Sequence, residues 1–268
     1  MKKRIFITVK TYPSLSKKFD ELVCTAGITE DGSWIRIYPI VFRGLDYVKQ
    51  YRKYQWVELD LKPNRKDPRV ESFNPVNMED ITLGEVIGTD GGTWERRKDI
   101  VLKNVHMEMD KLICKAERRK TSLAVFKSTE VLNFTFKKED EDWDKKKRKA
   151  FEDQFKLFPE ERKIFEPLVK LPYRFLYEFK DSVGKKSCLS ILDWEIGSLF
   201  LRQLKSKGSE EKALEDVKKK YSEDFLKNKE IYFFLGTSKE HHFTAKNPYM
   251  IIGVFYPKKD DYEKKLFD

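Results

Sequence analysis

The stretch IYFFLGT at residues 231–237, followed by YMIIGVFYP at residues 249–257, carries the strongest fold signal in this chain of 268 residues. Both runs are apolar and rich in aromatic and β-branched residues, which is typical of buried strands. The polar segment between them contains His241 and His242, two of the three histidines in the sequence. We therefore expect a pair of core strands joined by a loop that presents titratable side chains.

Four segments in the first half of the chain also have strand character. Their apolar residues alternate with polar ones, or they are rich in β-branched and aromatic residues. Gly, Pro and Asp residues typical of turns separate them, and short strands divided in this way favour a small barrel or sandwich. The segments are residues 5–9, 21–28, 34–38 and 55–61.

Helical periodicity is confined to three segments, and the other apolar runs are short enough to be strands. Asp193 is well placed as the N-cap of one helix, and Gly208 is suited to end it. The helical segments are 94–116 with a break near residue 104, 193–207, and a third that begins at Ser209; further strands are expected at 122–126, 131–136, 173–179 and 187–192.

The clearest shift in composition is the charged block KKEDEDWDKKKRK at residues 137–149. Blocks of this kind are typical of linkers or exposed helices. We therefore predict a first β-barrel domain at residues 1–136, a charged linker or helix at 137–170, and a second α+β domain at 171–268.

The chain is basic, with 55 Lys and Arg against 45 Asp and Glu and a net charge of +10. A basic surface attracts polyanions such as DNA, RNA or anionic lipid. The alternative is that a composition rich in Lys and Glu serves solubility alone. Hydrophobic residues make up 40% of the chain, which is enough for packed cores and argues against a disordered protein.

The cysteines Cys24, Cys114 and Cys188 lie far apart and form no CxxC pair. A zinc ribbon or a thioredoxin-type site is therefore not expected, and we predict neither a metal nor a cofactor. Scattered, odd-numbered cysteines favour a reducing compartment. The N-terminal apolar run ends at Lys10, and no run reaches the roughly 20 residues that span a bilayer. We expect a cytoplasmic protein without a membrane partner.

Aromatic and basic residues that alternate suggest contacts to nucleic acid. On the expected strand 34–38, Trp34, Arg36 and Tyr38 share one face. Their rings would stack on bases while the guanidinium holds a phosphate. The alternative is that both rings face the barrel core and Arg36 pairs with a carboxylate. The other predicted contacts are Lys10, Arg43, Arg69 in the basic loop 65–69, Lys239 beside a glycine and two hydroxyls, and His241 or His242 at a second contact site.

Two acidic sets are compatible with a metal-dependent nuclease, in which carboxylates bind Mg²⁺ and a lysine steadies the attacking water. Alternation on a half-exposed strand and helix capping explain these sets without a metal. Walker A, GxGxxG, HExxH, GxSxG and kinase motifs are absent, so catalysis is not the leading hypothesis. The sets are Glu58, Asp60 and Lys62, and Glu178, Asp193 and Glu195.

Seven short segments carry a family resemblance: KTYPSLS (10–16), ELVCTAG (21–27), GSWIRIYP (32–39), DPRVES (67–72), ILDWE (191–195), YFFLGT (232–237) and IIGVFYP (251–257). Together they resemble an uncharacterised prokaryotic family described as dual-OB-containing, over nearly the whole chain. The resemblance brings no catalytic residues. It implies two OB-like barrels, a fold that binds single-stranded nucleic acid on one sheet face and its loops, in a conflict or defence setting.

We therefore expect a β-rich α+β fold made of two small OB-like β-barrels with inserted helices. The predicted function is the binding of single-stranded or structured DNA or RNA, without catalysis. The setting is a sensor or targeting subunit of bacterial antiviral defence, with a protein partner in such a complex. The alternatives are a metal-dependent nuclease and a protein-interaction module whose basic charge is incidental.

Overall fold

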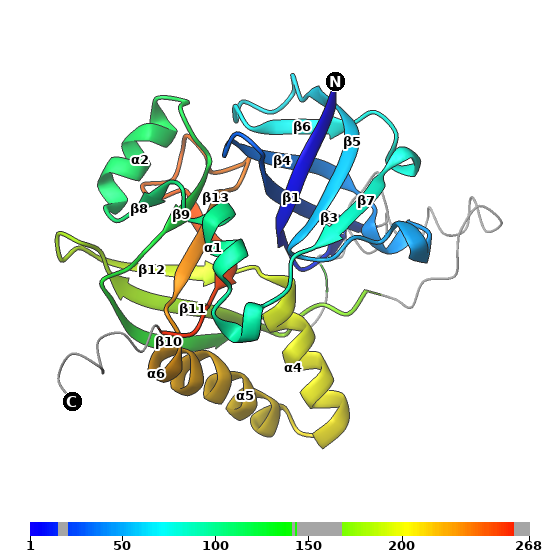
Figure 1. The fold of residues 1–268 in the computed structure, drawn as a ribbon. Coiled ribbons are helices and arrows are strands. Elements are labelled where there is room, and N and C mark those ends of the chain that lie inside the picture. Colours follow the sequence, from blue (N-terminus) through cyan, green and yellow to red (C-terminus); the bar gives the residue numbers. More distant parts are fainter. Residues whose placement is uncertain (16–20, 141–142, 144–167, 260–268) are drawn as a thin grey trace.

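The computed structural model describes residues 1–15, 21–140, 143 and 168–259 (Figure 1). The described chain forms two strand-rich halves that pack against each other. The first half runs from β1 to β7 and the second from β8 to β14. Most of the predicted linker 137–170 lies outside the described residues.

The strands of the first half close into a barrel, because β1 pairs antiparallel with both β3 and β5. The ring follows the order β1-β3-β4-β6-β5, with β2 paired to β3 and β7 paired to β5. Inward-facing residues such as Ile5, Ile7 and Ile35 fill its core. The strands are β1 (Lys2–Lys10), β2 (Ser14–Leu15), β3 (Glu21–Thr29), β4 (Trp34–Ile40), β5 (Gln55–Pro63), β6 (Ser72–Pro75) and β7 (Thr82–Val86).

The strands of the second half form one sheet in the order β10-β11-β12-β14-β13-β9-β8. The two apolar runs at residues 231–237 and 249–257 form β13 and β14, which pair antiparallel as predicted. The pairs β12–β14 and β8–β9 are parallel. The strands are β8 (Val105–His106), β9 (Leu123–Phe126), β10 (Glu130–Lys138), β11 (Tyr173–Lys180), β12 (Lys186–Ile191), β13 (Tyr232–Thr237) and β14 (Tyr249–Phe255).

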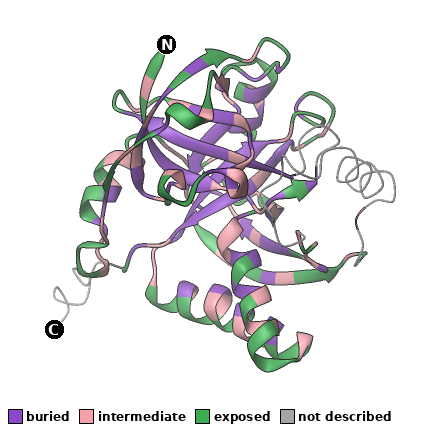
Figure 2. Cartoon of the chain, turned by 90° about the vertical axis from the view of Figure 1, so that its right-hand side faces the viewer, coloured by how far each residue is buried: buried purple, intermediate pink, exposed green. Residues whose placement is uncertain are grey.

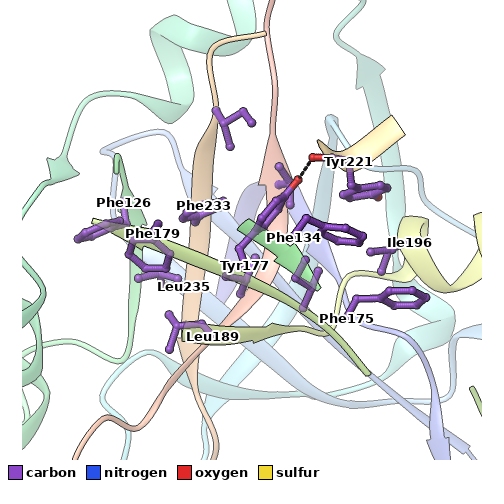
Figure 3. Packing of buried hydrophobic residues seen from close by; sticks show 14 of the residues in the cluster. Phe126, Phe134, Phe175, Tyr177, Phe179, Leu189, Ile196, Tyr221, Phe233 and Leu235 are labelled. Carbon is purple, nitrogen blue, oxygen red and sulfur yellow. Dashed lines mark hydrogen bonds between the residues drawn. The ribbon is translucent and has the colours of Figure 1, made fainter. Parts of the chain in front are cut away.

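Helices pack against the second sheet and complete its core (Figures 1 and 3). Phe134 and Phe175 of the sheet meet Ile196 and Tyr221 of the helical segment in this cluster. The hydroxyl of Tyr177 donates a hydrogen bond to the carbonyl of Tyr221. The helices are α1 (Glu95–Val101), α2 (Met109–Glu117), α4 (Trp194–Lys207), α5 (Glu210–Lys218), a π-helical segment (Lys219–Asp224) and α6 (Phe225–Asn228). No described helix is long and apolar enough to cross a membrane.

Local sequence signals placed the helix ends correctly. Asp193 caps α4 by accepting a hydrogen bond from the backbone N–H of Glu195, and Gly208 ends it with a φ of 65°. Ser209 caps α5 through the N–H of Lys212. The predicted break in 94–116 is also confirmed, because the short strand β8 separates α1 from α2. These signals lie in the residues next to each helix end, so they can be read from the sequence without knowledge of the tertiary fold.

The two halves share an apolar cluster, which we call the seam. It unites Phe6 and Ala26 of the barrel with Val125, Phe234 and Phe255 of the second sheet, each at most 1% exposed. Buried residues follow the strands through the centre of the molecule in Figure 2. A cluster of this kind resists separation, because parting the halves would expose apolar surface to water.

The predicted β-rich α+β fold with OB-like barrel construction is confirmed, with a closed five-stranded ring in the first half. Strands β8 to β10 pair in the second sheet, so the change from one sheet to the other falls before β8. This is earlier in the chain than the composition shift at 137–149. Strands β10 and β11, between which most of the charged block falls in sequence, pair in one sheet, so the block does not coincide with the change from one sheet to the other.

Candidate nucleic-acid interface

The row of side chains predicted as a stacking platform lies on β4. Ile35 and Ile37 face the barrel core, so Trp34, Arg36 and Tyr38 point out of the barrel, as the period of a strand requires. The second half covers this outer face. The ring of Trp34 lies 5.8 Å from that of Phe234 in an edge-on contact. Trp34 therefore packs against the seam, Arg36 is buried against Ser122 and Thr237 of the second half, and Tyr38 is half-buried, so the three do not form an open platform.

Arg36 is the charged residue of this row, and it is only 1% exposed. Its Nη1 donates to Ser122 Oγ at 2.8 Å, and its Nη2 lies 3.3 Å from the Ser122 carbonyl and 3.5 Å from that of Thr237. Burial, and secondarily the neighbouring Arg69, lowers the pKa of Arg36. Among the described residues these partners are neutral oxygens, so Arg36 is not bonded directly to a described carboxylate, which was the alternative expectation.

Arg69 reaches the same carbonyl from the loop between β5 and β6. Its Nη1 donates to the Thr237 carbonyl at 2.5 Å, while Nε and Nη2 grip the carboxylate of Asp67 at 2.8 and 2.6 Å. Both arginines thus tie the barrel to the end of β13. The phosphate contacts predicted for Arg36 and Arg69 are corrected accordingly, because guanidinium groups held in this way do not face an approaching backbone.

Lys10 and Arg43 are also engaged within the protein. The Lys10 ammonium donates to the Tyr51 carbonyl at 3.2 Å and lies 4.1 Å from the centre of the Phe42 ring. Burial, with Lys53 nearby, lowers the pKa of Lys10 to about 8. Arg43 donates to Glu21 at 3.0 Å. Neither side chain lies at the basic groove described below.

The loop after β13 splits the remaining predicted residues. Lys239 and His241 are exposed, whereas His242 is 2% exposed and its Nδ1 lies 2.9 Å from Thr237 Oγ1. Burial, and then Arg69 and Arg36, lowers the pKa of His242. The adjacent histidines therefore lie in different environments, His241 exposed and His242 buried beside Thr237.

Acidification is expected to destabilise the protein through His242. Its pKa is lowered from the usual 6.5, so the folded imidazole is neutral while the unfolded chain takes up a proton first. The contribution of neutral His242 to the free energy of unfolding is therefore fully present above about pH 6.5. It is lost as the pH falls from there to the folded pKa, by at most about 1.4 kcal/mol per pH unit.

Urea unfolding midpoints measured across this pH range check the expectation. His242→Asn should flatten the dependence, and the exposed control His241→Asn should preserve it. A profile unchanged by His242→Asn would show that the protonation of His242 does not limit acid stability.

An open groove of about 920 Å³ runs along the barrel surface beside the seam. Its lining includes the exposed cations Lys62, Arg65, Lys66 and Lys239, together with the half-buried Tyr38. None of the four cations forms a salt bridge within the described residues. Unpaired positive charges beside an aromatic ring are the combination that holds phosphates and stacks bases.

Local hydrogen bonds shape the groove wall. The Asn64 side chain accepts the N–H of Lys66 at 3.2 Å, and its carbonyl accepts the N–H of Asp67 at 3.0 Å, which fixes the turn after β5. Asn74 on β6 donates to the Tyr38 carbonyl at 2.7 Å. These bonds hold the turn and the end of β4 in one surface.

A smaller pocket of about 250 Å³ lies behind the groove and shares Tyr38 and Lys239 with it. Its lining comes from both halves of the chain. Arg36 and Arg69 stand at this pocket, and apolar residues of β14 form part of its wall. A third cavity of about 540 Å³ lies at the opposite end of the β4 row, against Trp34.

The groove combines residues that the sequence pointed to and residues that it did not. Tyr38 and Lys239 were predicted contacts. Lys62 was assigned to an acidic set instead, and Arg65 and Lys66 were noted only as part of a basic loop. The signal that could have identified them is the run KPNRK at residues 62–66, because Pro and Asn form a turn that projects its cations together.

The two acidic sets do not assemble into a metal site. Glu58 and Asp60 lie near cations at the N-terminus, with Glu58 at 3.2 Å from Lys2. Asp193 is buried and pairs with Lys53 at 3.2 Å. Across the described ranges no group of three or more His, Cys, Asp or Glu residues could hold a metal ion.

Comparisons with known proteins agree with the division of the chain before β8. Residues 1–103 match a family model described as "Domain of unknown function (DUF8758)", and residues 105–268 match one described as "Domain of unknown function (DUF8757)". No curated protein matches the sequence. A solved structure titled "Structure of murine DNA binding protein bound with ds DNA" aligns over 96% of this chain and 94% of that chain, with 10% identity and a TM-score of 0.30. An alignment at this TM-score supports no inference.

Proposed function

We propose that the chain, which belongs to the DUF8757 family through residues 105–268, binds single-stranded or structured nucleic acid without catalysis. The observation that carries the proposal is the groove of about 920 Å³ with four unpaired cations and a tyrosine ring. Phosphates would lie against Lys62, Arg65, Lys66 and Lys239, and a base would contact Tyr38.

The structure supports this groove over the surface predicted from sequence, because its cations are exposed and not neutralised by described carboxylates. Release of counterions from the bound strand would supply most of the affinity, so binding should weaken steeply as salt rises. The role as a sensor or targeting subunit in bacterial defence, with a protein partner, is a proposal that rests on the sequence resemblance.

Charge reversal in the groove tests the proposal. The variant Lys62→Glu/Lys66→Glu should bind labelled single-stranded DNA and RNA roughly 10- to 100-fold more weakly. Its plot of log affinity against log salt should be flatter by about 1.4, since each lost phosphate contact removes about 0.7 for a single strand. Fluorescence anisotropy at several salt concentrations measures both quantities.

The matched control is Lys218→Glu/Lys219→Glu at the end of α5, which changes the net charge equally at exposed positions outside the groove. Affinity should fall only slightly in the control. Equal loss in both variants would mean that net charge and not the groove drives binding. No binding by the wild-type protein at low salt would remove the proposal.

A further inference from the structure

The pocket behind the groove has a character different from that of the groove itself. Leu192, Met250 and Ile252 of the second half contribute apolar surface, and Thr11 and Cys24 of the barrel line it as well. Its volume of about 250 Å³ lies below the roughly 300–1,000 Å³ that encloses a drug-sized ligand. The pocket has room for one small planar group, not for a stack of several.

Every charged residue among the described residues that line this pocket is a cation: Arg36, Arg69 and Lys239. Asp67 neutralises Arg69, but the hydrogen-bond partners of Arg36 are the neutral oxygens of Ser122 and Thr237. A buried guanidinium without a directly bonded carboxylate favours a ligand that brings electron-rich oxygen.

The pocket adjoins the groove. Tyr38 and Lys239 line both spaces, so a ring and an ammonium stand where the two spaces meet. A base has the required form: two apolar faces for Met250 and Ile252, and an edge that can carry carbonyl acceptors.

We propose that the pocket takes a single unstacked nucleobase with carbonyl acceptors and no exocyclic amino group, namely thymine or uracil, while the flanking phosphates stay in the groove. This proposal rests on the proposed function and adds to it a contact to the base. Adenine, cytosine and guanine would fit less well, because the exocyclic amino group of each is a donor and would meet a pocket whose charged groups are donors only.

Strands with identical charge but different bases test the inference. Wild-type protein should bind labelled octathymidylate about tenfold more tightly than an eight-unit abasic strand of the same charge, since one stacked base contributes a factor of that order. Octaadenylate should lie between them. Filling the pocket with Met250→Trp should reduce octathymidylate binding to the level of the abasic strand and leave abasic binding unchanged.

Val183→Trp is the matched control, because it introduces the same indole side chain at an exposed position that lines neither the groove nor the pocket. It should keep the preference for octathymidylate. Circular dichroism and a thermal melt would establish that Met250→Trp is folded.

A second measurement uses the wild-type pocket and needs no filled variant. Cys24 lines the pocket, so in the background Cys114→Ser/Cys188→Ser its reaction with a thiol reagent reports on occupancy. Octathymidylate at saturation should slow the modification of Cys24 at least about fivefold relative to the abasic strand at saturation. Free thymidine monophosphate serves as a further arm, and protection by it at equal concentration would identify a mononucleotide and not a strand as the ligand, which overturns the proposal.

The outcomes separate this inference from the proposed function. Equal affinity for octathymidylate and the abasic strand, with no protection of Cys24, would overturn the base pocket while the groove stays a nucleic-acid site. Binding weakened roughly 10- to 100-fold in Lys62→Glu/Lys66→Glu together with loss of base preference in Met250→Trp would support both. A wild-type protein that binds no strand would overturn both.

Discussion

Replacement of Asp67 by alanine is expected to lower the free energy of unfolding by about 3–5 kcal/mol, the range for removing one partner of a buried ion pair. The Asp67 side chain is 1% exposed and accepts hydrogen bonds from the Arg69 guanidinium and from Ser72 Oγ at 2.7 Å. Without it, the Arg69 charge would lie buried beside Arg36. The loss should appear as a lower urea midpoint, followed by tryptophan fluorescence.

The pH dependence of this pair is distinct from that of His242. Burial alone would raise the pKa of Asp67, but hydrogen bonds from Arg69 and Ser72 outweigh it and hold the pKa well below its usual range. The stabilisation is therefore present above about pH 4, where the unfolded carboxyl is ionised, and is lost as the pH falls toward the folded pKa.

The exposed Asp60 supplies the control for Asp67. Its side chain is 55% exposed and lies 3.7 Å from the N-terminal amine, so Asp60→Ala should change stability by less than about 1 kcal/mol. If Asp67→Ala were as mild as Asp60→Ala, the two buried arginines would not depend on the Asp67 carboxylate for their stability.

Replacement of Asp193 by alanine should be comparably severe, at about 3–5 kcal/mol. Asp193 is fully buried and connects three parts of the molecule. It accepts the N–H of Glu195 at the start of α4, the N–H of Val254 on β14 at 3.1 Å, and the ammonium of Lys53 from the barrel at 3.2 Å. Its loss would leave both a buried amide and a buried ammonium without this partner.

A double substitution tests whether the cost of Asp193→Ala comes from leaving the Lys53 charge buried and unpaired. Lys53→Met/Asp193→Leu replaces both charges by apolar groups and should be less destabilising than Asp193→Ala alone, because no unpaired charge is left. Thermal melts of the wild type, Lys53→Met, Asp193→Leu and the double variant measure the coupling free energy between the two residues. A double variant that unfolds as readily as Asp193→Ala would assign the loss to the capping bonds instead of the ion pair.

Sequence patterns were reliable wherever the physical cause is local. The alternation in 34–38 and 55–61 reports which side chains share a face of a strand, and the caps at Asp193 and Ser209 report where a helix begins. These features depend on backbone geometry within a few residues. They were sufficient to predict most of the strands and helices.

Alternation could not reveal what covers a strand face. The pattern on β4 correctly grouped Trp34, Arg36 and Tyr38, but an outward face can meet either water or another domain. The partners of Arg36 are Ser122 and Thr237, which lie 86 and 201 residues away in sequence. No local signal encodes such a contact, so a buried arginine was predicted as an exposed one.

The groove was hidden for a related reason. Lys62 and Lys66 are close in sequence, but Lys239 joins them only because β13 ends beside the barrel. The parallel pairing of β4 with β6 places Ser72 opposite Arg36 and brings the basic turn to this edge. Assembly of the site therefore depends on strand order, which composition and periodicity do not specify.

The shared apolar core between the halves also bears on the kinetics of recognition. One wall of the groove belongs to the barrel and the other carries Lys239. The distance between the two walls is therefore fixed when the two halves pack together through the seam. On the proposed function, an arriving strand would meet walls already held at a fixed separation. Little ordering entropy would then be lost on binding, and diffusion and ionic strength would govern the association rate.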